Sequence, residues 1–222
     1  MCGRFTLRER LNDLLREFDA EVRGEPFELF EQYNICPTNL IPVIREDESG
    51  ENELLRMQWG FVPSWAKDAK FCPINAVSET VASKPMFRSA IKKRRCLIPA
   101  DGFYEWKKLP KKTKGDAPWY FQVNGGKPFA FAGIWERWGE LESCAILTTT
   151  PNELMAPIHD RLPVILSPTD YDAWLDPTMN DPEKLTYLYE PFPASEMTMT
   201  RVSAYVNKVG NKGPQCLEAV ES

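Results

Sequence analysis

The second residue of the chain, Cys2, has chemistry that an internal cysteine lacks. The initiator methionine is usually removed when a small residue follows it, so we expect the mature chain to begin with a free cysteine. Such a residue holds an α-amine and a thiol on one carbon skeleton. With an aldehyde, the amine forms an imine, and the sulfur then adds to close a thiazolidine ring. By position alone, Cys2 could equally be a residue that merely follows the start codon.

The α-amine is the better nucleophile at neutral pH, because its pKa is about 7.7–8.0, against about 10.4 for lysine. At pH 7.5 about a third of such amines are neutral, compared with about 0.1% of lysine side chains. A lysine imine also has no neighbouring sulfur and therefore hydrolyses easily. A free Cys2 would thus be suited to stable capture of a carbonyl compound.

Three polar residues could assist this chemistry. His159, the only histidine, lies in the polar segment IHDRLP before an apolar strand, a common place for a functional side chain. Glu105 lies among aromatic residues in DGFYEWK, where lost hydration would favour a bound proton and suit general acid–base catalysis. Asn75, in PINAVSET, carries an amide that can both donate and accept. Ordinary roles stay open for each: a structural histidine, a salt bridge to Lys107 and a turn asparagine.

Side-chain direction leads to two further expectations. Neighbours in an extended segment point to opposite faces, so Asp160 should not be the carboxylate partner of His159. On a strand through this region, Phe103, Glu105 and Lys107 should share one face.

The charge distribution favours contact with a polyanion more than the net charge of −5 does. Residues 67–112 carry twelve Lys or Arg and four Asp or Glu, a net +8, which leaves −13 for the rest. A local basic region suffices for phosphate contacts, although a solvated lysine-rich face would have the same composition. Aromatic side chains could stack on unpaired bases, although most tryptophans belong to cores. The candidates are Trp59, Trp65, Phe87 and Trp106.

Other classes of protein are excluded by composition and spacing. Six widely spaced cysteines, without a C-x-x-C pair and with one histidine, predict no zinc site and no disulfide framework, and we expect no cofactor. No apolar run approaches 18 residues, and the N-terminus has neither a secretory h-region nor a myristoylation pattern. We therefore expect a cytoplasmic protein of one domain, residues 1–222, that does not contact membranes.

The elements that position these residues can be read from local patterns. Thr6 followed by Glu9 is a capping-box signature, and apolar residues at helical spacing from Leu7 to Phe18 predict a helix directly behind it. Cys2 would then lie just before an anchored element.

Strands are expected through most of the remaining chain. Ile41–Arg45 and Glu53–Trp59 should form a hairpin, and a second should join Trp119–Val123 to Pro128–Ile134 through an Asn-Gly-Gly turn. Further strands are predicted at Arg95–Pro99, Phe103–Lys107, Ser143–Thr149 and Val164–Leu166. Helices are predicted at Pro85–Lys93, at Asn152–Ile158 and after a Ser167 cap with Pro168 at the first position. Lys107–Asp116 should be a mobile basic loop. This pattern indicates an α+β fold with a mainly antiparallel, curled or barrel-like sheet and flanking helices.

Taken together, several segments resemble the SRAP family, whose members crosslink to abasic sites in single-stranded DNA. The matching segments are MCGRF (1–5), YNICPT (33–38), WGFVPSW (59–65), NA (75–76), RCLIPADGFYEW (95–106), AGIWE (132–136), IHDRLP (158–163) and, more weakly, residues 206–214. They occur in order along nearly the whole chain.

The resemblance implies that Cys2 is the nucleophile, with Asn75, Glu105 and His159 around it. Glu105 would open the deoxyribose hemiacetal and move protons, His159 would assist at the sugar oxygen, and Asn75 would orient the terminus. The implied partner is single-stranded DNA with an abasic site, bound by a monomer that becomes nucleoid-associated on DNA.

DNA contacts are implied around this site, with one departure from the family pattern. The family reads N-A-R-x-E, whereas Val77 occupies the arginine position here. We therefore expect weaker phosphate contacts there, with nearby basic residues compensating. The expected contacts are Arg4, Trp65, Lys70, Lys84, Phe87, Arg88, Trp106 and Arg161.

Two other functions compete with covalent capture. A thiol peptidase, acting even on its own terminus, could use Cys2, His159 and Asn75, although a peptidase has no need of a nucleophile at position 2. A non-covalent single-strand binder would use only the basic region and the tryptophans. AP-lyase cleavage of the bound strand is a further activity that the sequence leaves open.

Overall fold

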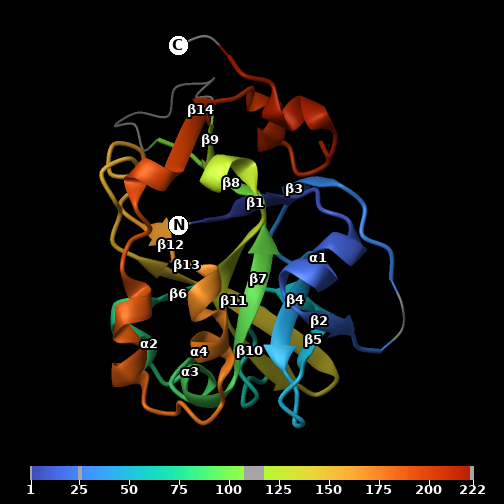
Figure 1. The fold of residues 1–222 in the computed structure, drawn as a ribbon, viewed down its shortest axis with the longest axis vertical. Helices are drawn as coiled ribbons and strands as arrows, with labels where there is room; N and C mark the ends of the chain where they lie inside the picture. Colours follow the sequence, from blue (N-terminus) through green and yellow to red (C-terminus); the bar gives the residue numbers. More distant parts are fainter. Residues whose placement is uncertain (1, 25–26, 108–117, 221–222) are drawn as a thin grey trace.

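The computed structural model describes residues 2–24, 27–107 and 118–220, and it shows two sheets with short helices around them (Figure 1). The predicted α+β fold with a barrel-like sheet is confirmed. The predicted basic loop at 107–116 falls almost wholly outside the described residues.

Five strands of the larger sheet close into a ring. Antiparallel pairs join β11 to β10, β10 to β7, β7 to β4 and β4 to β5, and a parallel pair between β5 and β11 completes the circle. The ring strands are β4 (Leu40–Glu46), β5 (Asn52–Trp59), β7 (Arg95–Ala100), β10 (Phe129–Trp138) and β11 (Leu141–Thr149). Short strands extend it: β2 (Ala20–Val22), β6 (Asn75–Val77), β12 (Leu162–Pro163) and β13 (Ile165–Leu166).

The smaller sheet lies over one end of the ring in the order β14–β9–β8–β1–β3 (Figure 1). Its strands are β1 (Arg4–Leu7), β3 (Gln32–Ile35), β8 (Gly102–Glu105), β9 (Trp119–Val123) and β14 (Met197–Arg201). β1 is a central strand that pairs with both β3 and β8, so the N-terminus is built into the fold.

The predicted capping box at Thr6 is wrong. Thr6 lies in β1, and the first helix, α1 (Leu11–Glu17), begins only after Arg10 without a side-chain cap. The Thr6 hydroxyl instead bonds the Asp101 carboxylate and lies 2.9 Å from the Tyr120 hydroxyl. Pairing with two distant strands prevails over the local helix signal, because it satisfies the backbone groups on both sides of the segment.

The predicted hairpin across the Asn-Gly-Gly turn is also wrong, although both strands exist. β9 pairs with β8 and β14, whereas β10 pairs with β7, β11 and β13. The turn at Asn124–Gly126 has positive φ at all three residues and passes the chain from one sheet to the other. The β4–β5 hairpin is confirmed, with Ile41 opposite Met57.

The helices are short. α3 (Ala90–Lys93) covers only the end of the predicted 85–93 helix, and the predicted helix at 152–158 is a pair of turns, with Met155 accepting from the backbone of Ile158 and His159. The helix after Ser167 is confirmed as η2 (Pro168–Asp170) and α4 (Tyr171–Leu175), but Ser167 makes no side-chain cap. The others are α2 (Ser78–Val81) and 3-10 helices η1 (Asn124–Gly126), η3 (Pro182–Tyr189), η4 (Ala194–Glu196), η5 (Ala204–Asn207) and η6 (Pro214–Leu217).

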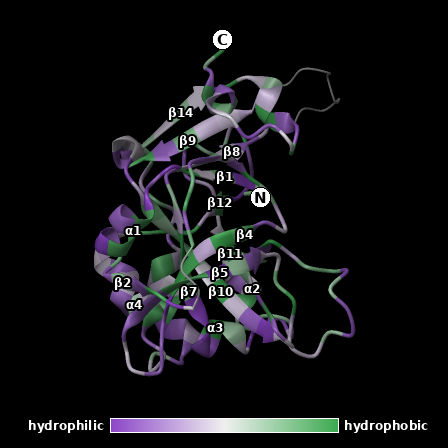
Figure 2. Cartoon of the chain, turned by 90° about the vertical axis from the view of Figure 1, so that its right-hand side faces the viewer, coloured by the Kyte–Doolittle hydropathy of each residue, from purple (hydrophilic) through white to green (hydrophobic). Residues whose placement is uncertain are grey.

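Aromatic contacts connect the two sheets through one core. Phe5 of β1 is fully buried, with its ring 5.1 Å from that of Trp59 and 5.8 Å from that of Phe131. Figure 2 shows hydrophobic stretches along the ring strands and hydrophilic residues at the outer turns. Among the described residues, no helix is long and apolar enough to cross a membrane.

Candidate functional site

Cys2 lies where the two sheets meet. Its side chain is fully buried, its carbonyl accepts a hydrogen bond from Asn75 Nδ2 at 2.9 Å, and its thiol lies 3.7 Å from the Arg4 carbonyl. Figures 1 and 2 both place the N-terminal end beside β12, between the smaller sheet and the ring. Cys2 is therefore held between the two sheets.

Asn75 is held from the other side of this junction. It begins β6, which runs parallel to β11 with Asn75 opposite Ile146, and its side chain is 8% exposed. The amide Nδ2 holds Cys2, while the buried Oδ1 has no hydrogen-bond partner among the residues described. A buried acceptor beside Cys2 is suited to a donor on a reactant or on the terminal nitrogen.

Glu105 reaches Cys2 from β8. Tyr104 pairs with Arg4, so the next residue of β8 comes beside the start of β1. Glu105 is 3% exposed, and alternation along β8 puts it on the same face as Phe103. The predicted strand to Lys107 is too long, because β8 ends at Glu105 and Lys107 is exposed beyond it. Burial and then the Glu105 charge raise the pKa of the Cys2 thiol well above its ordinary range. The thiol is therefore neutral at physiological pH, and the Glu105 carboxylate lies near enough for its charge to act on that thiol.

His159 lies in the turn before β12, on the side of the junction where β12 meets β11. Its Nδ1 is 2.9 Å from Asp160 Oδ1 and also 3.0 Å from the backbone nitrogen of Arg161. The expectation that Asp160 could not partner His159 is thus wrong, because the chain turns here instead of running extended. When Nδ1 carries a proton, it can donate to the Asp160 carboxylate, and when it does not, it can accept from the Arg161 backbone N–H. Each protonation state of Nδ1 therefore has a hydrogen-bond partner.

Arg161 is paired with a carboxylate. Its guanidinium makes two 2.7 Å hydrogen bonds to Glu79 and a further one to the Thr148 carbonyl. The Arg161 hydrogen bonds lower the pKa of Glu79 to about 2. A phosphate would have to compete with Glu79 for Arg161.

Arg4 has a different environment on the opposite flank of Cys2. Its guanidinium donates to Asn34 Oδ1 at 2.9 Å and to the Val206 carbonyl at 2.8 Å, and it lies 5.9 Å from the Trp106 ring centre. The Trp106 Nε1 donates to Asn207 Oδ1 at 2.8 Å. With Gly3, which follows Cys2 in the chain, these side chains line a pocket of about 330 Å³.

The remaining expected DNA contacts divide by exposure. Trp65 is 66% exposed on a loop held by a hydrogen bond from Trp138 to the Ala66 carbonyl. Lys70, which lies 3.5 Å from Asp68, is also exposed, as are Lys84 and Arg88. Those four residues stay candidates.

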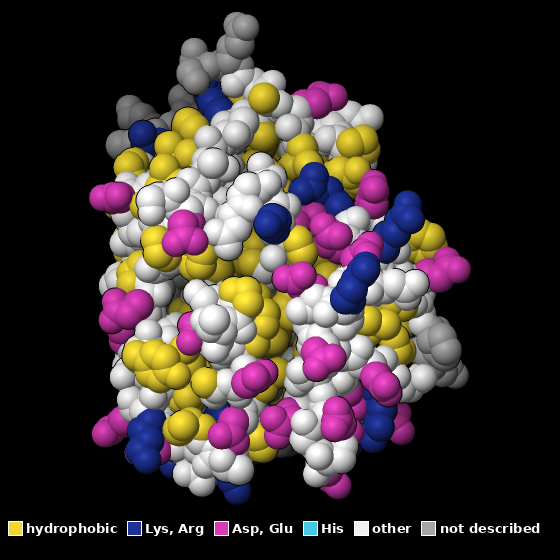
Figure 3. Space-filling view, viewed as in Figure 1, with side chains coloured by type: hydrophobic (Ala, Val, Ile, Leu, Met, Phe, Trp, Pro, Cys, Tyr) yellow, Lys and Arg dark blue, Asp and Glu magenta, His cyan; other side chains and the backbone are white. Residues whose placement is uncertain are grey.

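Two aromatic candidates and part of the basic region are taken up by the fold. Trp59 is fully buried, and Phe87 is 5% exposed against Phe61, so neither can stack on a base. Arg95 is buried among backbone carbonyls, and Arg94 pairs with Glu136. Figure 3 shows Lys and Arg dispersed among Asp and Glu on the face it presents.

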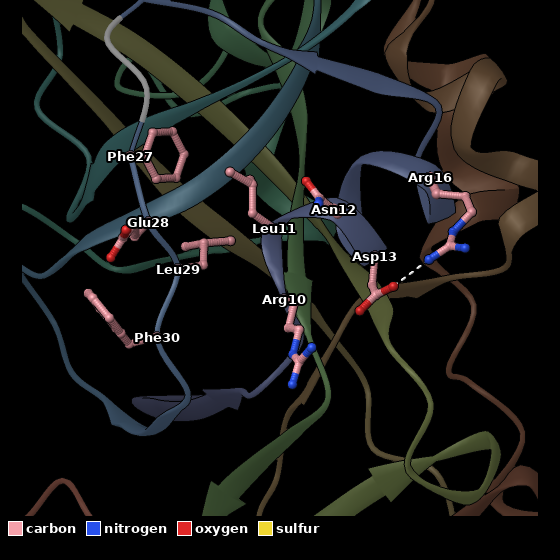
Figure 4. A pocket seen from close by; sticks show the side chains of 9 residues that line it. All are labelled: Arg10, Leu11, Asn12, Asp13, Arg16, Phe27, Glu28, Leu29 and Phe30. Atoms are coloured by element: carbon pink, nitrogen blue, oxygen red, sulfur yellow. Dashed lines mark hydrogen bonds and ion pairs between the residues drawn. The ribbon is translucent and has the colours of Figure 1, made fainter.

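Two other features of the described chain were compared with the Cys2 site. Over the described ranges, no group of three His, Cys, Asp or Glu side chains could hold a metal ion. A hollow of about 600 Å³ lies between α1 and residues 27–30 (Figure 4), where Asp13 and Arg16 pair with each other. It shares no residue with the Cys2 site.

Two residues that support the site, Asp101 and Asn34, were not predicted from the sequence. The Asp101 carboxylate accepts from Thr6 and from both the backbone and side chain of Arg8, and so fixes β1 against β8. Asn34 holds Arg4 and the segment after β14. Both lie inside segments that carried the family resemblance, which was the available signal. Val77 ends β6 opposite Thr148 and immediately precedes α2. Because the residue is valine, this position carries no positive charge.

Comparison with known proteins identifies the family and the fold of the chain. The family model for SOS response associated peptidase (SRAP) proteins matches residues 1–209. YoqW of Bacillus subtilis, named an abasic site processing protein, is 42% identical over 99% of this chain and 100% of its own length. HMCES of Gallus gallus, which carries the same description, is 31% identical over 85% of this chain and 66% of its length. A crystal structure of a Bacteroides thetaiotaomicron protein shares the fold, with a TM-score of 0.88 over 99% of this chain and 100% of that chain at 24% identity. The chain therefore belongs to the SRAP family.

Proposed function

We propose that this protein captures abasic sites in single-stranded DNA through a covalent bond to Cys2 and shields them during replication and the response to DNA damage. The observation that carries the proposal is the buried Cys2 held by Asn75 beside the Glu105 carboxylate. The names of the relatives, abasic site processing proteins, support the choice of lesion. The protein acts as a single-domain monomer on DNA in the cytoplasm.

The chemistry begins with the ring-opened deoxyribose, which presents an aldehyde. The α-amine of Cys2 adds to the aldehyde carbon, and loss of one water gives an imine. The thiol then adds across the C=N bond and its proton passes to nitrogen, which closes the thiazolidine. Glu105 opens the hemiacetal and moves protons, His159 serves the sugar oxygen, and Asn75 holds the terminus in place. One water is released, and the reaction consumes no oxidant or reductant.

The raised pKa of the Cys2 thiol supports an order in which nitrogen reacts first. A neutral thiol is a weak nucleophile, whereas about a third of α-amines are neutral at pH 7.5. The thiol needs no ionisation of its own to close the ring if Glu105 accepts its proton during attack.

The test is adduct formation on a uracil-excised single-stranded oligonucleotide. Intact mass first establishes that methionine has been removed from the purified chain. The processed protein should then give a complex that survives denaturing electrophoresis, and Cys2→Ala should not. A residue added before Cys2 should also abolish the stable complex, because the amine becomes an amide. A complex that persists with such an extension would indicate a thiol-only reaction, and the absence of any complex with processed wild-type protein would reject the proposal.

A thiol peptidase is the competing activity, since the family description includes that word. A nucleophilic cysteine of this kind needs a lowered thiol pKa, whereas burial and Glu105 raise that of Cys2. Turnover of a peptide library by the wild-type protein, lost in Cys2→Ala, would favour the peptidase. Equal affinity for abasic and intact strands without a covalent product would favour a simple binder. Products of strand cleavage on the same gels would reveal lyase activity.

A further inference from the structure

Asn34 is the centre of a hydrogen-bond network behind the Cys2 site. It lies in β3 and is fully buried. Its Oδ1 accepts from Arg4, and its Nδ2 lies 3.2, 3.1 and 2.8 Å from the carbonyls of Val206, Lys208 and Asn211. One side chain therefore holds both a site arginine and the backbone of residues 206–211.

Within the described part of the chain, the Arg4 guanidinium is held by neutral groups. Its hydrogen-bond acceptors, Asn34 Oδ1 and the Val206 carbonyl, are both uncharged. By contrast, Arg161 binds Glu79 and Arg8 binds Asp101. A guanidinium fixed by neutral acceptors keeps its remaining N–H groups and its charge for an anion.

The segment held by Asn34 also forms a wall of the pocket lined by Gly3. Asn207 lies between the carbonyls that Asn34 contacts, and its Oδ1 accepts from the Trp106 indole. Trp106 in turn lies under the Arg4 guanidinium. Arg4 and Trp106 are thus fixed relative to each other through Asn34.

We propose that Asn34 is a positioning residue for DNA capture, which holds Arg4 so that its guanidinium binds the phosphodiester next to the sugar that reacts with Cys2. This inference rests on the proposed function and assigns part of the strand to the pocket of Gly3, Arg4, Trp106 and Asn207. Asn34 itself touches no DNA, because it is fully buried. Its contribution is to binding of the strand and not to bond formation.

The experiment measures binding separately from reaction. A single-stranded oligonucleotide with a tetrahydrofuran abasic analogue has no aldehyde and therefore cannot be captured covalently. Its dissociation constant is measured by fluorescence anisotropy at several salt concentrations. Asn34→Ala should weaken binding about tenfold, the loss of one charge-assisted contact, and should lower the slope of log K against log salt by about 0.7. The rate of adduct formation at saturating abasic DNA should stay within twofold.

A double-mutant cycle separates positioning from general destabilisation. Arg4→Ala should reproduce both changes, and Asn34→Ala should add nothing further in the Arg4→Ala background. Asn152→Ala is the matched control, because that amide also holds a backbone carbonyl, of Phe192 at 2.7 Å, but lies outside this network. It should lower the melting temperature without changing the salt slope.

A second variant covers the case in which Asn34→Ala does not fold. Arg4→Lys keeps the charge at a partly exposed position. A lysine ammonium that takes over the two acceptors of Arg4 Nη1 lacks the Nε and Nη2 donors that remain for a phosphodiester, so it should weaken binding several-fold. Wild-type affinity and slope in Asn34→Ala, additive losses in the cycle, or wild-type affinity in Arg4→Lys would each overturn the inference. Failure of the proposed function would instead appear as no covalent product in the wild-type protein.

Discussion

The start of β1 and the wall of the ring both contain fully buried cysteines, and only one of these places is suited to chemistry. Cys2 lies at the first, and Cys96 and Cys144 lie at the second. Burial raises the pKa of all three thiols, and at Cys144 burial is the only cause. Around Cys2, however, there are also the Asn75 amide and the Glu105 charge.

If Cys2 is the nucleophile, as proposed, enclosure of a thiol is not what creates a reactive centre. The ring cysteines are small core residues, opposite Gly133 and Trp135 on β10. What distinguishes Cys2 is a carboxylate, an amide and, after loss of methionine, an amine on the same residue. The predictions below test that distinction, from the largest effect to the smallest.

Replacing the cysteines one at a time should separate the two regions completely. Cys2→Ala should form no adduct stable to denaturation, although the alanine amine can still give an imine that borohydride traps. Cys144→Ala should form the adduct at the wild-type rate and lose about 0.5–3 kcal/mol of folding stability from the smaller side chain. Gel analysis and urea unfolding measure the two effects. A denaturation-stable adduct in Cys2→Ala would remove the distinction.

Glu105→Gln should slow adduct formation by about 10²–10⁴-fold, the usual contribution of general acid–base catalysis. The amide has nearly the same shape, so folding should be retained. Single-turnover kinetics on abasic oligonucleotide measures the rate. Glu53→Gln is a control, since that carboxylate is also buried but pairs with Arg45 on the ring. If both variants react at the wild-type rate, Glu105 has no part in proton transfer.

The pH dependence of capture should follow the amine and not the thiol. Because the Cys2 thiol pKa is raised, the thiol stays neutral from pH 6 to 9. The neutral fraction of an α-amine rises about 40-fold from pH 6 to pH 8 and then levels off. The rate of adduct formation should do the same. A rate that continues to climb beyond pH 9 would show that thiolate attack limits the reaction.

The smallest expected effect concerns the Glu79–Arg161 pair at the edge of the site. Its lowered pKa means that Glu79 stabilises the fold above about pH 4.5, and that this stabilisation is lost as the pH falls toward about 2. The Glu79 side chain is 46% exposed, so Glu79→Gln should cost only about 0.2–1 kcal/mol at pH 7. Urea unfolding of both proteins at pH 7, 4 and 3 measures the change. A difference that grows toward pH 3 would contradict this account.

The sequence predicted the barrel-like fold best where contacts are local. The β4–β5 hairpin follows from two apolar segments on either side of a short polar loop, and the two strands pair as expected. The helix start predicted at Thr6 was wrong, because the capping signal is local whereas the partners of Thr6, Asp101 and Tyr120, are about a hundred residues away. Nothing near the Asn-Gly-Gly turn indicates that the chain changes sheet there.

The candidate site was accessible from the sequence mainly through its motifs. The hydrogen bond between Asn75 and Cys2 and the approach of Glu105 depend on β6 and β1, two strands that local patterns did not predict. The type of a single residue was less informative. Phe87, for example, is an aromatic residue of the kind that stacks on bases, but it is buried in the core. The network around Asn34 depends on contacts with residues more than 170 positions away, which no local pattern encodes.

The central position of β1 determines when the reactive terminus can be prepared. An aminopeptidase must reach the bond in front of Cys2, yet Cys2 is fully buried once β1 pairs with β8, where Arg4 lies opposite Tyr104. That partner strand is made a hundred residues later, about 5–20 s of translation at typical ribosomal speeds. On the proposed function, removal of methionine should therefore take place on the nascent chain, and a slow aminopeptidase would leave folded protein that forms no adduct.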